Sequence, residues 1–592
     1  MSSLFYLNKY LLKYKWYLIL GILTIIISNI FFVMMPDIVK TAIDDIIAYT
    51  QNNVNHLTKS DILNLALKGA GIYILLSLAK GFFLFLTRQT IIKMSRFIEF
   101  DLKNEIYQQY QKLSFNFYKE NATGDLMNRI SEDVSKVRMY LGPGIMYTIN
   151  LVILFTILLY KMLETNVTLT IYVLLPLPIM SILIYFVSSV INKKSTMLQK
   201  KQSELSTIVQ ENFSGIRIIK SYIKEEEAKI KFNKATNDYK SQSISLAKTN
   251  AFFMPTIILL IGLSTVITIY LGIKLNLAGE ITTGEIVKFV FYVNMLTWPF
   301  ASVGWVTSVI QRAAASQARI NEFLKQQSEI NTPSNLPFEF KNKIEFKNVA
   351  LTYTNSGTTA LSNVSFSVNK GKTIGVIGKT GSGKSSLAYL LLRLLDPTNG
   401  SVLINGKNLK TINLDEWRKI IGYVPQEHFL FSDTIKNNII FGLKDEKVAD
   451  EVIIQAAKSA GIHETIINFP NGYDTILGER GINLSGGQKQ RISIARALIK
   501  QPQLLILDDC LSAVDNETEE LILNAIKSTA INDKDKTLFI ISHRISSIKY
   551  ADKIIVLDKG IIAEEGTHNE LMKRKQLYFE IYEKQRLSDE GK

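Results

Sequence analysis

A short glycine-rich segment in the second half of the chain has the residues needed to hold phosphate groups. It reads GKTGSGKS from Gly378 to Ser385, after an apolar run from Lys372 to Ile377 and before the helical run SLAYLLLRLL. A glycine-rich turn between a strand and a helix lets backbone N–H groups close around phosphates, while a lysine adds positive charge and a serine hydroxyl binds Mg²⁺. The predicted phosphate-binding residues are Gly378, Lys379, Thr380, Gly381, Ser382, Gly383, Lys384, Ser385 and Ser386, and Ser385 is also a predicted Mg²⁺ ligand.

Two further segments extend this chemistry. LLILDD, Leu504 to Asp509, predicts a buried strand that ends in carboxylates, of which Asp508 would hold Mg²⁺ and Asp509 would lie near an attacking water. LSGGQ precedes the basic helical run KQRISIARAL, and its glycine pair at a helix N-terminus makes a second anion-binding surface. The residues predicted for that surface are Ser485, Gly486, Gly487 and Gln488. The three segments together predict ATP and Mg²⁺ as ligands.

The elements that must position these residues form an α/β domain at the C-terminal end. A helical stretch ends near Ser328, Pro333 and Pro337 punctuate a polar linker, and a β-rich segment begins near Lys343. Residues 343–592 are therefore predicted to form one α/β phosphate-loop domain, after a linker at 329–342. Cys510 is the only cysteine in the sequence, which excludes an intrachain disulfide framework, and beside a buried strand it is predicted to be a packing residue.

Residues 1–328 predict a membrane domain, an α-helical bundle of six transmembrane helices. The apolar runs are Trp16 to Met35, Gly69 to Thr87, Gly144 to Tyr160, Thr165 to Ile191, Thr249 to Ile273 and Phe289 to Ile310. A helix needs about 20 apolar residues to cross a hydrocarbon core of roughly 30 Å, and six such runs are improbable in a soluble core. Two connections, at 88–142 and 192–248, exceed 50 residues and are patterned as helices, which predicts long cytoplasmic extensions.

The positions of charged residues predict the orientation in the cell membrane. Lys9, Lys13 and Lys15 precede the first span, whereas Asp37 and Asp44 follow it. Because basic residues mark the cytoplasmic side, we expect the N-terminus and the ATP-binding domain to be cytoplasmic. Much of the net charge of +15 then lies at the membrane face, so the expected partners include membrane lipid and exclude nucleic acid.

One ionisable residue stands inside a predicted span. Lys80 lies about 11 residues into the second run, roughly 16 Å deep at about 1.5 Å per residue. Such a residue either lines a polar cavity or extends its amine to a membrane interface. The sequence identifies no partner for it.

The combination resembles the ATP-binding cassette (ABC) transporters, as a half-transporter of the exporter type, over nearly the whole chain. The resemblance implies a dimer with ATP held between the phosphate loop of one cassette and the LSGGQ segment of the other. It implies that Tyr353 stacks on adenine, that Gln426 binds Mg²⁺ and senses the membrane domain, and that His543 contacts the γ-phosphate. The segment Leu113 to Val134 resembles the first coupling region of such exporters.

Asp509 departs from the family pattern, because a glutamate usually follows the Mg²⁺-binding aspartate. Its carboxylate would stand about 1 to 1.5 Å further from the attacking water, beyond the reach that general-base catalysis needs. The pattern resembles the degenerate-site subunit of heterodimeric multidrug exporters, which implies a second half-transporter as partner. The alternative is an active homodimer in which Asp509 serves as the base, together with His543 and Gln426.

We therefore expect an ATP hydrolase coupled to transport, which exports amphipathic drugs or lipids. The apolar and aromatic spans suggest that class of small-molecule substrate, although the sequence does not fix the direction of transport. Two alternatives are a homodimeric lipid or glycolipid flippase and, from another functional class, an ATP-gated channel or regulator. A pump builds a solute gradient at the expense of ATP, whereas a channel dissipates one.

Overall fold

A computed structural model describes residues 2–52, 59–331, 337–354, 356–443, 448–510, 519–526 and 535–590. The chain divides into two compact units, and each is described by itself. The first unit comprises residues 1–111 and 124–326, and the second comprises residues 112–123 and 327–592. The short segment 112–123 therefore belongs with the C-terminal unit although it lies between helices of the first.

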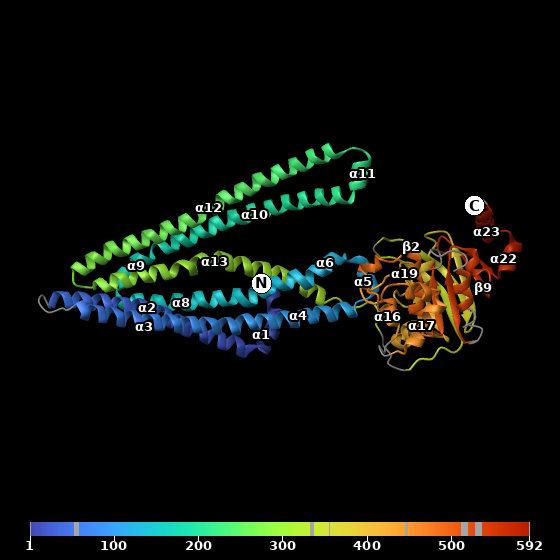
Figure 1. The fold of residues 1–592 in the computed structure, drawn as a ribbon, viewed down its shortest axis with the longest axis horizontal. Coiled ribbons are helices and arrows are strands. Elements are labelled where there is room, and N and C mark those ends of the chain that lie inside the picture. Colours follow the sequence, from blue (N-terminus) through green and yellow to red (C-terminus); the bar gives the residue numbers. More distant parts are fainter. Residues whose placement is uncertain are drawn as a thin grey trace. The chain divides into compact units, whose positions relative to one another are not determined.

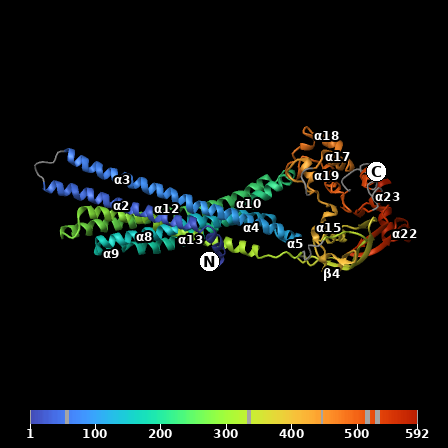
Figure 2. The same cartoon turned by 90° about the horizontal axis from the view of Figure 1, so that it is seen from below.

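The first unit consists of helices, several of them far longer than a typical globular helix. Its helices are η1 (Ser2–Leu7), α1 (Asn8–Lys13), α2 (Lys15–Asn52), α3 (Lys59–Thr87), η2 (Arg88–Ile92), α4 (Lys93–Lys112), α6 (Thr123–Asn128), η3 (Arg129–Asp133), α7 (Val134–Met139), η4 (Tyr140–Gly144), α8 (Ile145–Thr165), α9 (Val167–Leu174), α10 (Pro176–Ser214), α11 (Ile216–Ser221), α12 (Glu225–Leu277) and α13 (Thr283–Leu324). Helices α2 and α3 lie side by side, as do α10 and α12 (Figures 1 and 2).

Among the described residues, five helical stretches are long and apolar enough to cross a membrane. They are Lys15–Ala48, Leu63–Lys112, Thr123–Thr165, Glu225–Leu277 and Thr283–Leu324. The remaining predicted span, at 165–191, falls on α9 and the start of α10, which are interrupted at Leu175. Leu175 keeps a helical backbone conformation, with φ −57° and ψ −38°, and Pro176, which has no N–H to donate, begins α10. The count of six spans stays a prediction.

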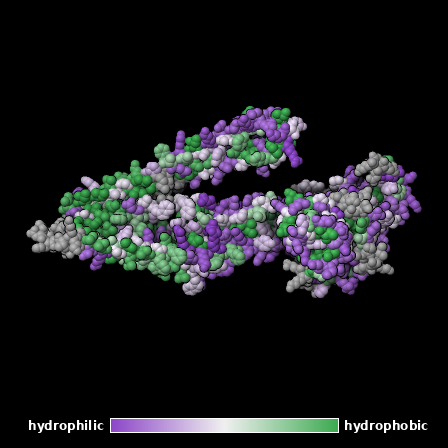
Figure 3. All heavy atoms as spheres, viewed as in Figure 1, coloured by the Kyte–Doolittle hydropathy of each residue, from purple (hydrophilic) through white to green (hydrophobic). Residues whose placement is uncertain are grey.

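Apolar side chains face outward along these helices, as a lipid environment requires. On α3, Leu75, Leu78 and Phe82 are each more than half exposed. In Figure 3 hydrophobic residues gather over the helix ends near α9, whereas hydrophilic residues cover the ends near α11. This distribution agrees with a bundle whose α9 end lies in the membrane and whose α11 end lies in water.

Polar contacts inside the first unit join helices that are far apart in sequence. Lys288 on α13 pairs with Asp37 on α2 at 2.6 Å, and Lys40 pairs with Glu285 at 2.9 Å. Lys80, for which the sequence identified no partner, places its Nζ 3.3 Å from the ring centroid of Phe32 on α2. Burying an amine against an aromatic face offsets part of its desolvation cost.

The second unit contains two sheets. Its strands are β1 (Lys343–Thr352), β2 (Thr359–Asn369), β3 (Thr373–Gly378), β4 (Asn399–Ile404), β5 (Lys407–Asn408), β6 (Ile421–Val424), β7 (Leu504–Asp508), β8 (Thr537–Ile541), β9 (Lys553–Asp558) and β10 (Ile561–Gly566). One sheet has the order β2-β1-β4-β5, and the other has the order β10-β9-β3-β8-β7-β6, with β9, β3, β8, β7 and β6 parallel. Because β3, β8 and β7 are neighbours, the residues that follow each of them meet at one edge.

Helices cover the six-stranded sheet, and one small helix comes from the segment between α4 and α6. The helices of this unit are α5 (Phe115–Glu120), α14 (Lys384–Leu391), η5 (Leu409–Thr411), α15 (Leu414–Lys419), α16 (Ile435–Ile440), α17 (Asp450–Ser459), α18 (His463–Ile467), η6 (Gly472–Asp474), η7 (Glu479–Gly481), α19 (Gly486–Leu498), α21 (Ile545–Ile548), α22 (His568–Arg574) and α23 (Leu577–Glu590). The strands β7 and β8 are buried along their whole length, which explains their continuous apolar sequence.

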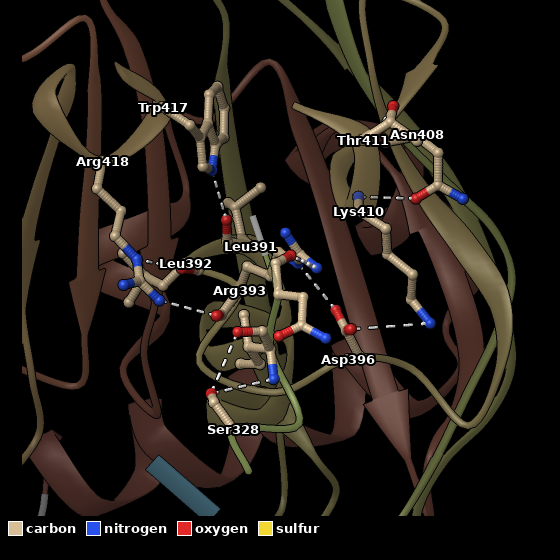
Figure 4. Close-up of polar contacts among 12 residues, drawn as sticks. Ser328, Leu391, Leu392, Arg393, Asp396, Asn408, Lys410, Thr411, Trp417 and Arg418 are labelled. Atoms are coloured by element: carbon tan, nitrogen blue, oxygen red, sulfur yellow. Dashed lines mark hydrogen bonds and ion pairs between the residues drawn. The ribbon is translucent and has the colours of Figure 1, made fainter. Parts of the chain in front are cut away.

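Two side chains of α15 cap the end of the phosphate-loop helix, α14. Trp417 Nε1 donates to the carbonyl oxygen of Leu391 at 2.8 Å, and Arg418 donates to those of Leu392 and Arg393 at 3.0 and 2.8 Å (Figure 4). The last carbonyl groups of a helix have no partner within it and favour a positive charge nearby. These bonds therefore fix the C-terminal end of α14, whose N-terminal end carries the phosphate loop.

Replacing Arg418 with alanine is expected to lower the stability of the second unit by about 1 to 3 kcal/mol, because two buried carbonyl groups lose their donor. Lys419→Ala is the matched control, since its side chain pairs only with Glu416 at the surface and a surface pair contributes about 0 to 1 kcal/mol. Thermal unfolding of the full chain in lipid would measure both. Equal effects of the two substitutions would contradict the capping role.

Candidate functional site

The phosphate loop connects β3 to α14, as the sequence predicted. Gly383 has a φ of +96°, and a Cβ atom there would lie 2.2 Å from the carbonyl oxygen of Ala360, so only glycine fits. Lys384 is buried, and its Nζ donates to the carbonyl oxygens of Gly378 and Lys379 at 2.9 and 2.8 Å. The lysine thus ties the start of the loop to the start of the helix and presents its charge inside the turn.

The acidic strand end lies beside this loop. Ser385 Oγ donates to Asp508 Oδ1 at 2.9 Å, which brings the two predicted Mg²⁺ ligands of these elements together. In the described part of the chain, Asp508 Oδ2 is buried without a hydrogen-bond partner. A buried carboxylate oxygen with no donor is costly unless a cation or water satisfies it. The pair Ser385 and Asp508 therefore fits a hard divalent cation such as Mg²⁺.

The charge state of Asp508 responds to its burial. Burial raises the pKa of Asp508 to about 6, and the negative charge of Asp509 adds to this, against lowering effects of Ser385 and Lys384. The folded state therefore binds a proton more tightly than the unfolded chain does. Ionisation of Asp508 costs stability in full above about pH 6, and that cost shrinks as the pH falls from this pKa toward the ordinary value of 3.8, below which it disappears.

Asp508→Asn is therefore expected to stabilise the chain free of Mg²⁺ and nucleotide at pH 7.5 by about 2 kcal/mol, or roughly 4 to 8 °C in the melting temperature of the second unit. The amide has the same shape and no charge to desolvate. At pH 4 the gain should largely vanish, because the parent carboxyl is then protonated in the folded chain and close to half protonated in the unfolded chain. Calorimetry at both values measures the difference, and an equal shift at both would contradict the raised pKa.

Asp509 lies where the predicted catalytic residues converge. Its Oδ2 accepts from Gln426 Nε2 at 3.3 Å and lies 3.8 Å from His543 Nε2, while its Oδ1 accepts from the His543 N–H at 3.4 Å. Burial and the charge of Lys384 lower the pKa of His543, against the opposing effect of Asp509. The structure thus brings Gln426, Asp509 and His543 together, from three elements of the sheet edge.

Tyr353 lies beside α14 and also contacts a residue of α5, a helix that is far from it in the sequence. Its hydroxyl is 3.0 Å from Ser386 Oγ, and Lys119 of α5 places its Nζ 4.7 Å from the centroid of the Tyr353 ring. Lys119 also lies 4.9 Å from the centroid of the Tyr389 ring, and Phe115 packs against that same ring. No local motif marks these contacts, because α5 and Tyr353 are more than 200 residues apart.

The LSGGQ segment forms a helix start separate from the phosphate loop. Ser485 caps α19: its Oγ accepts from the Gln488 N–H at 3.3 Å, and its own N–H donates to Gln488 Oε1 at 2.9 Å. Gly486 and Gly487 begin the helix with their backbone N–H groups in its first turn. Within the described residues, no hydrogen bond or ion pair joins this segment to the phosphate loop. One chain therefore carries two anion-binding elements rather than one composite site.

Comparison with known families assigns both halves of the chain. Residues 18–300 match the family described as the ABC transporter transmembrane region. Residues 361–512 match the family described as ABC transporter, which includes the phosphate loop, the LSGGQ segment and the acidic strand. The two matches have the order that the sequence predicted.

Curated relatives cover almost the whole chain. It is 36% identical over 591 residues to the probable multidrug resistance ABC transporter ATP-binding/permease protein YheI of Bacillus subtilis, covering 99% of this chain and 98% of that protein. It is 40% identical over 486 residues to the uncharacterised ABC transporter ATP-binding protein YknU of the same organism, covering 82% of each. A solved structure of a bacterial Atm1-family ABC exporter with ATP bound matches with a TM-score of 0.80 at 25% identity, over 96% of this chain and 98% of that chain.

The residues of the site and the matches to known families indicate the same kind of protein. The phosphate loop, the buried acidic end of β7 and α19, the helix that follows LSGGQ, lie in one α/β unit, which follows a bundle of apolar helices in the chain. ATP hydrolysis by such a cassette drives transport, and exporters of this kind act as dimers of two half-transporters. The chain belongs to the ABC transporters, as an exporter half-transporter with a membrane-integral helical domain and an ATP-hydrolysing cassette.

Proposed function

We propose that this chain is one subunit of a heterodimeric exporter of amphipathic drugs or lipids, and that its own ATP site is degenerate. The observation that carries the proposal is the short Asp509 carboxylate at the position of the general base. Gln426 and His543 both lie against it, so the rest of the hydrolytic site is present. The partner subunit would supply the efficient base, and the LSGGQ segment of this chain would complete the partner's site.

Several features support the residue roles. The phosphate loop with Lys384 would bind the β- and γ-phosphates, Tyr353 would stack on adenine, and His543 would contact the γ-phosphate. Ser385, Gln426 and Asp508 would hold Mg²⁺, which when bound neutralises phosphate charge. Asp508 Oδ2 and the buried Ser382 Oγ, which have no hydrogen-bond partner among the described residues, both suit a polar ligand.

Two helical turns support coupling between cassette and membrane domain. The first, α5, belongs to the cassette unit: Phe115 packs on its core, and Asn116 Nδ2 lies 3.3 Å from Glu329 Oε2. The second, α11, ends the α10–α12 hairpin, where the apolar side chains of Phe213, Tyr222 and Ile223 are 73, 73 and 84% exposed. An exposed apolar tip fits a surface that a second half-transporter covers. We propose that both turns transmit ATP-driven movement to the spans.

We further propose that α11, the N-terminus and the cassette lie on the cytoplasmic side of the cell membrane. The basic residues around the first span support this orientation. The domain limits of 1–328, 329–342 and 343–592 remain our proposal for the functional division. The substrate class is supported by the apolar, aromatic spans and by the multidrug names of several relatives.

Reconstitution tests the proposal. The chain would be purified alone and with each co-purifying half-transporter, placed in lipid vesicles, and supplied with ATP and an amphipathic fluorescent dye. We expect dye to accumulate only with the partner present, and Lys384→Ala in both subunits to abolish it. Movement of a labelled lipid without dye accumulation would favour the flippase. Loss of a preformed dye gradient without matching ATP turnover would favour a channel.

A further inference from the structure

The loop that carries His543 is short and depends on a distant side chain. Strand β8 ends at Ile541 and α21 begins at Ile545, so three residues make the connection. Gln585 Nε2 donates to the carbonyl oxygen of His543 at 2.6 Å, and Gln585 Oε1 accepts from the N–H of Ile545 at 2.9 Å. One side-chain amide therefore satisfies the carbonyl group of His543 and the N–H group of Ile545, which flank Arg544.

Gln585 is well placed to hold this loop because its helix is anchored elsewhere. It lies on α23, on the same face as Tyr578, Ile581 and Tyr582, which follow the helical spacing i, i+3, i+4 and i+7. Tyr578 is fully buried, and its N–H donates to Glu564 Oε1 at 2.9 Å. Ile581 and Tyr582 pack against the core. Two turns of anchored helix therefore present Gln585 to the loop.

In the same loop, Arg544 makes shorter hydrogen bonds than the backbone N–H of His543 does. The N–H of Arg544 donates to Ser542 Oγ at 2.9 Å, and the Arg544 guanidinium pairs with the buried Glu519 at 2.9 Å. By contrast, the N–H of His543 reaches Asp509 only at 3.4 Å. The peptide plane that follows His543 is thus held at its carbonyl oxygen by Gln585 and at its N–H by Ser542, and this plane helps to set the direction in which the imidazole leaves the backbone.

We infer that Gln585 is a positioning residue for His543, so that the C-terminal helix α23 is part of the hydrolytic machinery. The inference rests on the role proposed for His543 at the γ-phosphate. The amide of Gln585 bonds to the backbone of the loop, and we infer that it acts by holding the imidazole toward Asp509. A chain in which Gln585 no longer bonds to this loop still binds ATP, because the phosphate loop with Lys384, and Tyr353, lie on other elements. Its effect should therefore be on turnover and not on nucleotide affinity.

The first test is kinetic, on the full chain carrying Asp509→Glu and assayed alone in lipid, so that the site that holds His543 is the one that turns over. Gln585→Leu keeps the size of the side chain and removes both hydrogen bonds. We expect kcat for ATP hydrolysis to fall about tenfold with KM unchanged, since misplacing a reacting group by about 1 Å can cost on the order of 100-fold. Gln576→Leu, the same change at an exposed position before α23, is the matched control and should leave kcat within about twofold.

A double substitution shows whether the effect passes through the histidine. In a His543→Ala background, Gln585→Leu should cause no further loss, because there is no imidazole left to position. If Gln585→Leu lowered kcat by the same factor with His543 present and with His543→Ala, the inference would be overturned. A raised KM with unchanged kcat would overturn it as well, because it would mean that Gln585 serves nucleotide binding.

The second test is independent of turnover. Amide hydrogen exchange at Ile545 should become about tenfold faster in Gln585→Leu, because that N–H loses its acceptor. Gln585→Glu keeps this acceptor but sets a carboxylate against the His543 carbonyl, so exchange at Ile545 should stay near that of the parent while kcat falls. If the Ile545 amide exchanged no faster in Gln585→Leu than in the parent, the inference that Gln585 holds this loop would be wrong. Unchanged turnover in His543→Ala would instead contradict the role proposed for His543.

Discussion

In the chain that carries Asp509→Glu and is assayed alone, so that its own site is the one that turns over, replacing Lys384 with alanine is expected to lower ATP turnover by about 100- to 1000-fold, because the phosphate loop loses its positive charge where charge develops on the transferred phosphate. The lysine is 6% exposed and bonds to the carbonyl oxygens of Gly378 and Lys379. Burial lowers the pKa of Lys384, against the opposing charges of Asp509 and Asp508. A bound triphosphate would add further negative charge and keep the amine protonated.

Phosphate release by the full-length Asp509→Glu chain alone in lipid, taken as the parent, measures this effect. Lys372→Ala is the matched control, because Lys372 lies just before the opposite end of β3 and pairs with Asp552 at the surface. The control should keep turnover within about twofold, as is usual for surface substitutions. Parental turnover in Lys384→Ala would contradict the assignment of the phosphate loop as the site of hydrolysis.

Asp509→Glu is expected to raise turnover by the chain assayed alone, by up to about 100-fold, because the longer side chain restores the reach of a general base. The carboxylate would move past its present contacts with Gln426 and His543 toward the attacking water. Asp509 has a φ of +47°, in the left-handed region that aspartate adopts more readily than glutamate. The substitution therefore also costs about 1 kcal/mol of stability.

Asp509→Asn is the matched control for the base, since it keeps the shape of the side chain and removes its charge. In a degenerate site it should leave the already slow turnover of the lone chain almost unchanged. Fast turnover by the parent that Asp509→Asn abolishes would instead mean an active homodimer, in which Asp509 is the base. Steady-state ATPase assays of the three proteins in lipid separate these results, and only the first calls for a search for the partner subunit.

The sequence was sufficient for features that depend on residues close together in the chain. The predicted strand at 372–377 is β3, shifted by one residue, and the acidic strand at 504–509 is β7 with Asp509 just after it. The helical connection predicted at 192–248 comprises the end of α10, α11 and the first part of α12. The connection predicted at 88–142 is also helical, but its segment 112–123, which holds α5, belongs to the cassette unit.

The sequence by itself determined the phosphate loop, the carboxylates, the signature helix and the apolar runs, because glycine geometry, charge and helical or strand periodicity act over a few residues. It did not determine which distant groups meet. Only the tertiary structure joined Gln585 to the backbone of His543, Lys119 to Tyr353, and Trp417 and Arg418 to the end of α14. These contacts depend on how whole helices pack on the sheet, and packing is set by the combined shape of many side chains rather than by any local pattern.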